Sequence, residues 1–285
     1  MNGKRQQIGF VLMWLCALFT AMMIFVIFAF LYNNANEFFS EHSLAEFLFG
    51  TRWKPSADEY GILPMILGSV LTTALSLGIA LPLGVFSVWY IHYYLPRRVQ
   101  KMLDFFVNIM AAIPSVVYGL FGLRVLVPAT RTVFGGTGFS VITVGLLLSL
   151  MILPTVITLY SSELSAIPDE YFSSALALGE SRERSIVKCI FPMSSYGVFS
   201  AGVLALGRSV GETMAVLMIA GNVAQIPRSL TAGVRTLTTN ISLEMGYAVG
   251  VHRSALIACG LVLLVIVLII ELFVFRMKRK IINEK

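Results

Sequence analysis

The chain contains 285 residues, of which 57% are hydrophobic and 13% are charged, and its formal net charge is +6. A water-soluble domain of this length needs a larger polar surface, so the composition excludes a single soluble core. The basic residues are spread over short loops and chain ends, as membrane topology requires, which argues against a nucleic-acid-binding face.

Six apolar stretches are long enough to cross a bilayer, whose core takes roughly 20 residues of α-helix. We therefore expect an all-α integral membrane protein with one transmembrane domain, residues 1–285. The first stretch is too long for the apolar core of a cleaved signal peptide, so we expect a retained helix. The expected spans are residues 8–32, 64–91, 105–127, 139–161, 197–220 and 255–275.

Prolines interrupt three of these spans, at Pro82, Pro114 and Pro154. Within lipid, a helix break survives only where protein or a water-lined cavity satisfies the freed carbonyl groups. Such breaks occur along transport pathways, and kinks that only improve packing are about as common. The prolines alone therefore leave both interpretations open.

The distribution of Lys and Arg predicts the orientation of the chain. With the N-terminus in the cytoplasm, 13 of the 21 basic residues fall in cytoplasmic pieces and 6 in outer pieces, while Arg124 and Arg208 lie inside spans. This asymmetry predicts that both termini are cytoplasmic. The three cysteines are widely separated, so we expect neither a disulfide nor a metal site. The sequence has no G-x-x-x-x-G-K-[ST] loop, so ATP binding of that kind needs another subunit.

The expected cytoplasmic loop, residues 162–196, has the pattern of two short helices joined by a sharp turn. Pro168 suits the start of the first helix, and Gly179 suits the left-handed position after its end. Ser181 could cap a second helix, which we expect to stop before Pro192. One face of the first helix carries Tyr171, Ala175 and Leu178, with Phe172 and Leu176 beside them. Such a face either binds a partner protein or lies on the lipid surface.

This loop resembles the cytoplasmic "EAA" loop of ABC importer permeases. Ala175, Gly179 and Pro192 keep that frame, whereas Ser173 and Ser174 replace the Glu-Ala pair. In the family, the loop forms a coupling helix that sits in a groove of the ATPase subunit. The resemblance implies that role for Ala175, Leu176, Gly179 and Pro192.

The segment GRSVGETMAV, residues 207–216, places Arg208 and Glu212 near the middle of the expected fifth span. A charged side chain there costs about 2.5–3.5 kcal/mol on the insertion scale. Two charges four residues apart share one helix face and can pair. Gly207 and Gly211 form a G-x-x-x-G pair, which lets another helix approach closely.

Two interpretations of these charges remain open. A self-contained Arg208–Glu212 pair could fix helix packing, or the two residues could form a substrate site for a small anion. A guanidinium group fits two phosphate oxygens, and a carboxylate can accept a hydrogen bond from protonated phosphate but repels sulfate. Arg124 lies near the outer end of its span, where snorkelling to the interface is the expected explanation.

The chain as a whole resembles the phosphate-specific ABC permease of the PstC type. Six strings carry the resemblance, in order and at the family's spacing, between about residues 47 and 256. They are FLFGTRWKP (47–55), YGILPMILGS (60–69), AAIPSVVYGLFG (111–122), MILP (151–154), GRSVGETMAV (207–216) and GYAVGVHRSAL (246–256).

The resemblance implies a MetI-like permease of the bacterial cytoplasmic membrane, which is a transport subunit and not an enzyme. It implies a heterodimer with a PstA-type permease, two copies of a PstB-type ATPase and a PstS-type phosphate-binding protein. It also implies that Arg208 and Glu212 act in phosphate passage, whereas it implies no role for Arg124. The alternatives are a permease of this fold for molybdate or sulfate, a stand-alone channel or proton-coupled carrier, and an intramembrane enzyme. The dispersed histidines argue against the enzyme.

Overall fold

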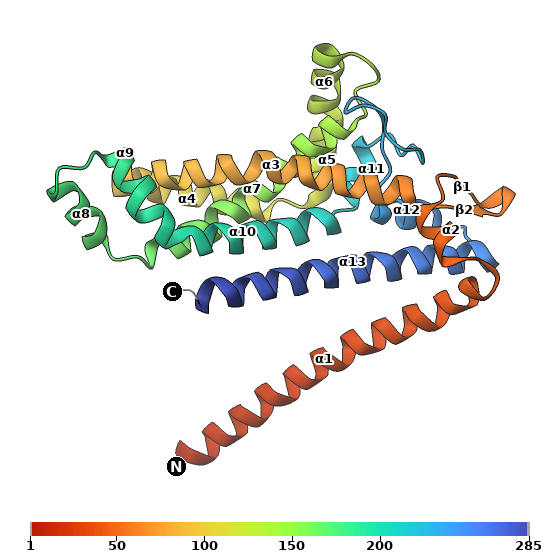
Figure 1. The fold of residues 1–285 in the computed structure, drawn as a ribbon, viewed down its shortest axis with the longest axis horizontal. Helices are drawn as coiled ribbons and strands as arrows, with labels where there is room; N and C mark the ends of the chain where they lie inside the picture. Colours follow the sequence, from red (N-terminus) through yellow and green to blue (C-terminus); the bar gives the residue numbers. More distant parts are fainter. Residues whose placement is uncertain (1, 284–285) are drawn as a thin grey trace.

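The computed structural model describes residues 2–283, which form a bundle of long helices (Figure 1). Within these residues, six helices are long and apolar enough to cross a membrane, which confirms the expected all-α membrane architecture. These spans are Gly9–Glu41, Leu63–Tyr94, Ser115–Phe134, Val141–Ser165, Arg182–Gly211 and Gly250–Val274.

Helices make up nearly all of the regular elements of the chain. The first half contains α1 (Asn2–Glu41), α2 (Leu44–Phe49), β1 (Trp53–Lys54), the 3₁₀ turn η1 (Pro55–Ala57), β2 (Glu59–Tyr60), α3 (Leu63–Tyr94), α4 (Arg97–Ala112), α5 (Ser115–Phe121), the π-helical turn η2 (Gly122–Leu126) and α6 (Val127–Phe134). The second half contains α7 (Val141–Ser165), α8 (Asp169–Ala177), α9 (Arg182–Ser185), the π-helical turn η3 (Ile186–Ile190), α10 (Phe191–Gly211), α11 (Met214–Ile219), α12 (Leu237–Glu244) and α13 (Gly250–Asn283).

Helix α7 forms the centre of the bundle and packs against α3 and α10. In its most apolar window, 67% of the helix is buried, more than in any other described span. Helix α1 packs along α13 and diverges from the other helices toward its N-terminal end (Figure 1). The apolar stretch of α1 is not buried within this chain, so lipid or another subunit must cover it.

The two ends of the bundle differ in what they carry. The N-terminal end of α1 and the C-terminal end of α13 lie toward the end that carries α8 and α9 (Figure 1). The antiparallel β1–β2 hairpin, α2 and α12 lie at the opposite end. The terminal basic residues counted for the orientation lie outside the residues whose side chains the structure describes: Lys4, Arg5, Lys278, Arg279, Lys280 and Lys285.

Breaks in the helices shift the start of the third expected span and the end of the fifth. The first and third spans also continue past the expected residues 32 and 127, to Glu41 and Phe134. The third begins at Ser115, not at residue 105, because the residue before Pro114 is pushed out of helical conformation, and Ile113 is extended with a ψ of 127°. The fifth was expected to reach residue 220, but α10 ends at Gly211 because Glu212 is extended. Pro82 and Pro154, by contrast, lie inside continuous helices.

The sequence predicted that the second short helix of the expected cytoplasmic loop stops before Pro192. This prediction was wrong. Instead, α9, η3 and α10 form one continuous rod from Arg182 to Gly211. The Phe191 N–H donates to the Ile186 carbonyl five residues earlier, which closes a π turn immediately before the proline. In an α-helix the ring of Pro192 would clash with the carbonyl four residues earlier, and the wider π turn relieves that crowding. The turn η2 does the same before Pro128.

Candidate functional site

The break between α10 and α11 positions both charged residues that the sequence singled out. Glu212 has an extended backbone, with φ −70° and ψ 129°, between the end of α10 and the start of α11. Its Oε1 accepts a hydrogen bond of 3.1 Å from the Ala215 N–H. A carboxylate suits this place because the first N–H groups of a helix lack partners within the helix.

Arg208 and Glu212 do not share one helix face, contrary to the expectation from an unbroken helix. The chain leaves helical geometry at Glu212, so the spacing of four residues no longer stacks the two side chains. Among the described residues, no ion pair or hydrogen bond joins them. Arg208 is exposed on the surface of this chain, and Glu212 is half-buried. The self-contained pair of the packing interpretation is therefore absent.

Gly207 and Gly211 flank the two charges and face open space within this chain. Apart from the backbone of α10 itself and the adjacent residues, a methyl group built on either glycine meets no described atom within 4 Å. The helix that they were expected to admit must therefore come from outside the described chain. Their role in close helix packing stays a prediction about an assembled complex.

The opposite side of α10 is held to α3 by buried hydroxyl groups. The Ser209 and Ser76 Oγ atoms lie 2.9 Å apart, and the Ser209 hydroxyl also lies 3.5 Å from that of Thr73. Neighbouring positions on a helix point in different directions, so anchoring Ser209 leaves Arg208 on the free side. The free surface thus combines a cation with the glycine pair.

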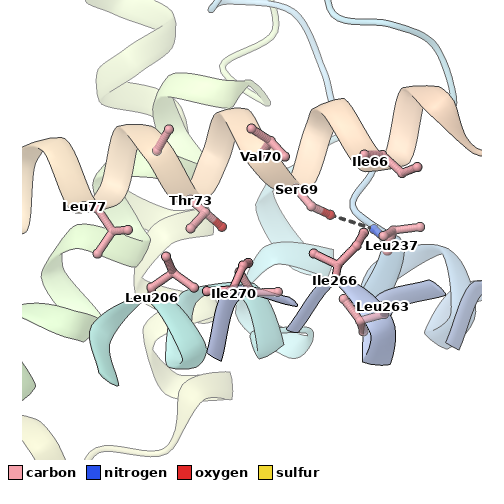
Figure 2. A pocket seen from close by; sticks show the side chains of 12 residues that line it. Ile66, Ser69, Val70, Thr73, Leu77, Leu206, Leu237, Leu263, Ile266 and Ile270 are labelled. Carbon is pink, nitrogen blue, oxygen red and sulfur yellow. Dashed lines mark hydrogen bonds between the residues drawn. The ribbon is translucent and has the colours of Figure 1, made fainter. Parts of the chain in front are cut away.

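A cavity of about 250 Å³ lies beside the break, between α3, α10, α12 and α13. Figure 2 shows its lining side chains, which are aliphatic except for Ser69 and Thr73. Ser69 Oγ accepts a hydrogen bond of 3.0 Å from the Leu237 N–H, drawn as the dashed line in Figure 2. No charged side chain lines this cavity, so it is unsuited to a small anion.

The loop between α7 and α10, which was expected to be cytoplasmic, has the helix and the sharp turn that the sequence predicted. Gly179 adopts a φ of +90°, and its N–H donates to the Leu176 carbonyl while the Glu180 N–H donates to that of Ala175. These two bonds form a Schellman motif, which satisfies the last carbonyls of α8. Leu178 is 87% exposed beside the turn.

The two sides of α8 differ in what they contact. Phe172 packs against Tyr93 of α3, with ring centroids 4.5 Å apart, and so fixes α8 on the bundle. On the free side, Tyr171 and Leu178 remain exposed. Of the four residues assigned to ATPase coupling, Ala175 and Leu176 are half-buried, and Gly179 and Pro192 are exposed. Two apolar side chains of the loop, Tyr171 and Leu178, are therefore open to a partner, and the coupling role of the four residues stays a prediction.

An ionic cluster around the buried Glu244, at the end of the bundle away from α8, was not predicted from the sequence. Glu244 accepts hydrogen bonds from Arg235 Nη1 at 2.7 Å and from Trp53 Nε1 at 2.8 Å. His252 Nε2 lies 2.9 Å from Glu244 Oε2, the same oxygen that Trp53 contacts. Arg235 Nη1 also donates to the Asn240 Oδ1 at 3.0 Å. The sequence did mark two of these residues, because Trp53 and His252 both lie in strings that carry the family resemblance.

The described residues contain no group of three or more His, Cys, Asp or Glu residues that could hold a metal ion.

Comparison with protein families supports a transport role. Residues 80–283 match the model of the family described as "Binding-protein-dependent transport system inner membrane component". The chain is 38% identical over 225 residues to the "Probable ABC transporter permease protein YqgH" of Bacillus subtilis, covering 77% of this chain and 73% of that protein. It is 32% identical over 245 residues to the "Phosphate transport system permease protein PstC" of Mesorhizobium japonicum, covering 79% and 75%.

Solved structures with a similar fold are ABC transporters. The chain matches the bacterial alginate ABC transporter with a TM-score of 0.66 and 17% identity, covering 97% of both chains. It matches the inward-facing MetNI methionine ABC transporter with a TM-score of 0.58 and 19% identity, covering 78% of this chain and 94% of that one. At these identities the likeness concerns the fold alone.

Proposed function

The chain belongs to the family of binding-protein-dependent transport system inner membrane components, and we propose that it is the permease subunit of an ATP-driven importer for inorganic phosphate. It is a multi-pass transport subunit and not an enzyme. The similarity to PstC phosphate permeases over more than three quarters of the chain carries this conclusion. An ABC importer permease works with a second permease, an ATPase and a binding protein.

We assign specific partners to these roles. They are a PstA-type permease, two copies of a PstB-type ATPase and a PstS-type phosphate-binding protein. The end with α8 and both chain termini faces the cytoplasm of a bacterial cell, and the end with the β hairpin receives the binding protein. Support comes from the excess of basic residues on the α8 side and from the exposed face of α8.

The free side of α10 forms this chain's half of the phosphate pathway. The forked guanidinium of Arg208 binds two phosphate oxygens, and the adjacent glycines bring the second permease close enough to complete the channel. Glu212 accepts a hydrogen bond from the protonated oxygen of phosphate. A carboxylate has about four lone-pair sites, and the Ala215 N–H occupies one of them, so acceptor capacity remains.

Uptake of labelled phosphate by cells that lack this chain tests the function. Wild-type chain should restore energised uptake at low external phosphate, and excess unlabelled sulfate or molybdate should not compete. Restored uptake of sulfate or molybdate without phosphate would replace the substrate while keeping the fold and the importer. Uptake without a co-purifying ATPase would point to a stand-alone carrier.

Replacing Glu212 by Gln is expected to reduce the preference for phosphate over sulfate. The amide is nearly isosteric, but it removes the charge that repels sulfate and weakens the acceptor for the phosphate proton, so we expect a loss of about tenfold in selectivity. Competition between labelled phosphate and sulfate measures this ratio at matched membrane levels. Glu59→Gln, an exposed residue of the outer hairpin, is the control. An unchanged ratio in Glu212→Gln contradicts the assignment.

A further inference from the structure

The short helix α12 joins the buried ionic cluster to the helix break. Glu244, its last residue, is 7% exposed and binds Trp53 of the outer hairpin, Arg235 of the preceding loop and His252 of α13. Three segments therefore converge on one carboxylate, and one of them, the hairpin with Trp53, is far away in the sequence. A buried carboxylate with three donors fixes its neighbours more firmly than exposed ion pairs do, because loss of any donor leaves polar groups unpaired.

The other end of α12 contacts the substrate pathway directly. The buried Thr238 donates from Oγ1 to the backbone carbonyl of Glu212 at 3.0 Å. Next to it, the Leu237 N–H donates to Ser69 Oγ and fixes the start of α12 on α3 (Figure 2). Thr236 caps the helix through a capping box with Thr239. Eight residues of α-helix span about 12 Å, so α12 is a short rigid connection between the two sites.

We propose that Thr238 is a positioning residue for the pathway carboxylate, and that α12 transmits movement of the outer loops from Glu244 to the break at Glu212. Extended backbone at membrane depth exposes carbonyl groups that no helix partner satisfies. The Thr238 hydroxyl supplies a donor to one of them, which favours the extended conformation of Glu212 over a continued helix. The position of the carboxylate then depends on where the cluster holds α12.

This inference rests on the proposed phosphate function only for the substrate, and not for the mechanical link. A movement of β1, the loop before α12 or the start of α13 displaces Glu244, because each segment donates to its side chain. The displacement reaches Glu212 through the helix, with no intervening flexible segment. A binding protein that docks on the outer loops can therefore change the site that receives the substrate.

The test uses the complete transporter in nanodiscs with its phosphate-binding protein. Thr238→Val removes the hydroxyl at nearly constant volume, Thr238→Ser retains it, and Thr231→Val removes a hydroxyl of the outer loop that pairs only locally with Ser229. We expect Thr238→Val to lower ATPase stimulation by the loaded binding protein roughly fivefold or more, because the variant loses the hydrogen bond to the Glu212 carbonyl and a 3.0 Å contact with the Thr236 hydroxyl. Thr238→Ser should restore stimulation, and Thr231→Val should resemble wild type.

Hydrogen exchange of residues 213–216 provides a readout that does not depend on the substrate. Thr238→Val should exchange faster there than wild type and Thr231→Val, because the Ala215 N–H bonds to the Glu212 side chain. Unchanged exchange in Thr238→Val, or unchanged stimulation, overturns the positioning role. If wild-type transporter responds to another anion and not to phosphate, the substrate assignment fails, and the exchange comparison still decides the role of Thr238.

Discussion

Replacing Arg208 by alanine is expected to abolish energised phosphate uptake while leaving the chain in the membrane. The side chain is exposed within this chain and makes no described hydrogen bond or ion pair, so its removal leaves no buried partner unsatisfied. A charge-assisted hydrogen bond contributes about 1.5–3 kcal/mol, and loss of a bidentate pair therefore predicts a fall of roughly 100-fold or more. Uptake at low external phosphate, with membrane levels matched by immunoblot, measures the effect.

Two further variants separate a substrate contact from a general need for charge. Arg208→Lys keeps the charge but loses the forked geometry, so partial activity is expected. Arg124→Ala removes the other arginine inside a span, which is also exposed, and should leave uptake near wild type. Full uptake with Arg208→Ala would return Arg208 to a structural role. Equal losses in both alanine variants would indicate a general electrostatic requirement.

Hydropathy was sufficient to predict the fold class, because the length of an apolar helix is set by bilayer thickness. The turn after α8 was also predictable, since glycine is the residue that most readily adopts the φ of +90° found at Gly179. Both features depend on local sequence alone.

The break at Glu212 was not predictable from local sequence. The segment GETMAV contains no proline, and glutamate and methionine are good helix formers, so propensity favours a continuous helix. The extended conformation is instead stabilised by tertiary contacts, from Thr238 to the Glu212 carbonyl and from Gly119, which lets α5 approach α11 closely. Glu212 therefore lies outside the helix, and its spacing of four residues from Arg208 does not place the two side chains on one helix face.

The Glu244 cluster was missed for a related reason. Its donors Trp53, Arg235 and His252 come from three separate segments, and no spacing rule connects them. Charges in loops are also usually solvated, so nothing in the sequence pointed to a structural role for Arg235. The structure shows that a charge counted for membrane topology, Arg235, can be a partly buried structural group.

Replacing Leu178 by aspartate is expected to uncouple the permease from its ATPase. Leu178 is 87% exposed in the loop between α8 and α9, beside the turn at Gly179, so the substitution should not disturb the fold of the chain. If this apolar side chain fills a groove of the ATPase, a charge placed there is desolvated without a partner and costs at least about 2 kcal/mol. The affinity should fall roughly 30-fold or more, measured as ATPase retained on the purified membrane complex.

Arg184→Ala is a suitable control for this prediction. Arg184 is exposed in the same loop and forms only a 3.9 Å pair with Glu180, which contributes little at the surface. If Leu178→Asp retains the ATPase as well as Arg184→Ala does, the exposed face of α8 does not contact the ATPase. The amphipathic loop would then lie on the lipid surface, as the sequence alone allowed. Loss of ATPase in Leu178→Asp with normal thermal stability of the isolated permease, by contrast, places the coupling contact at this turn.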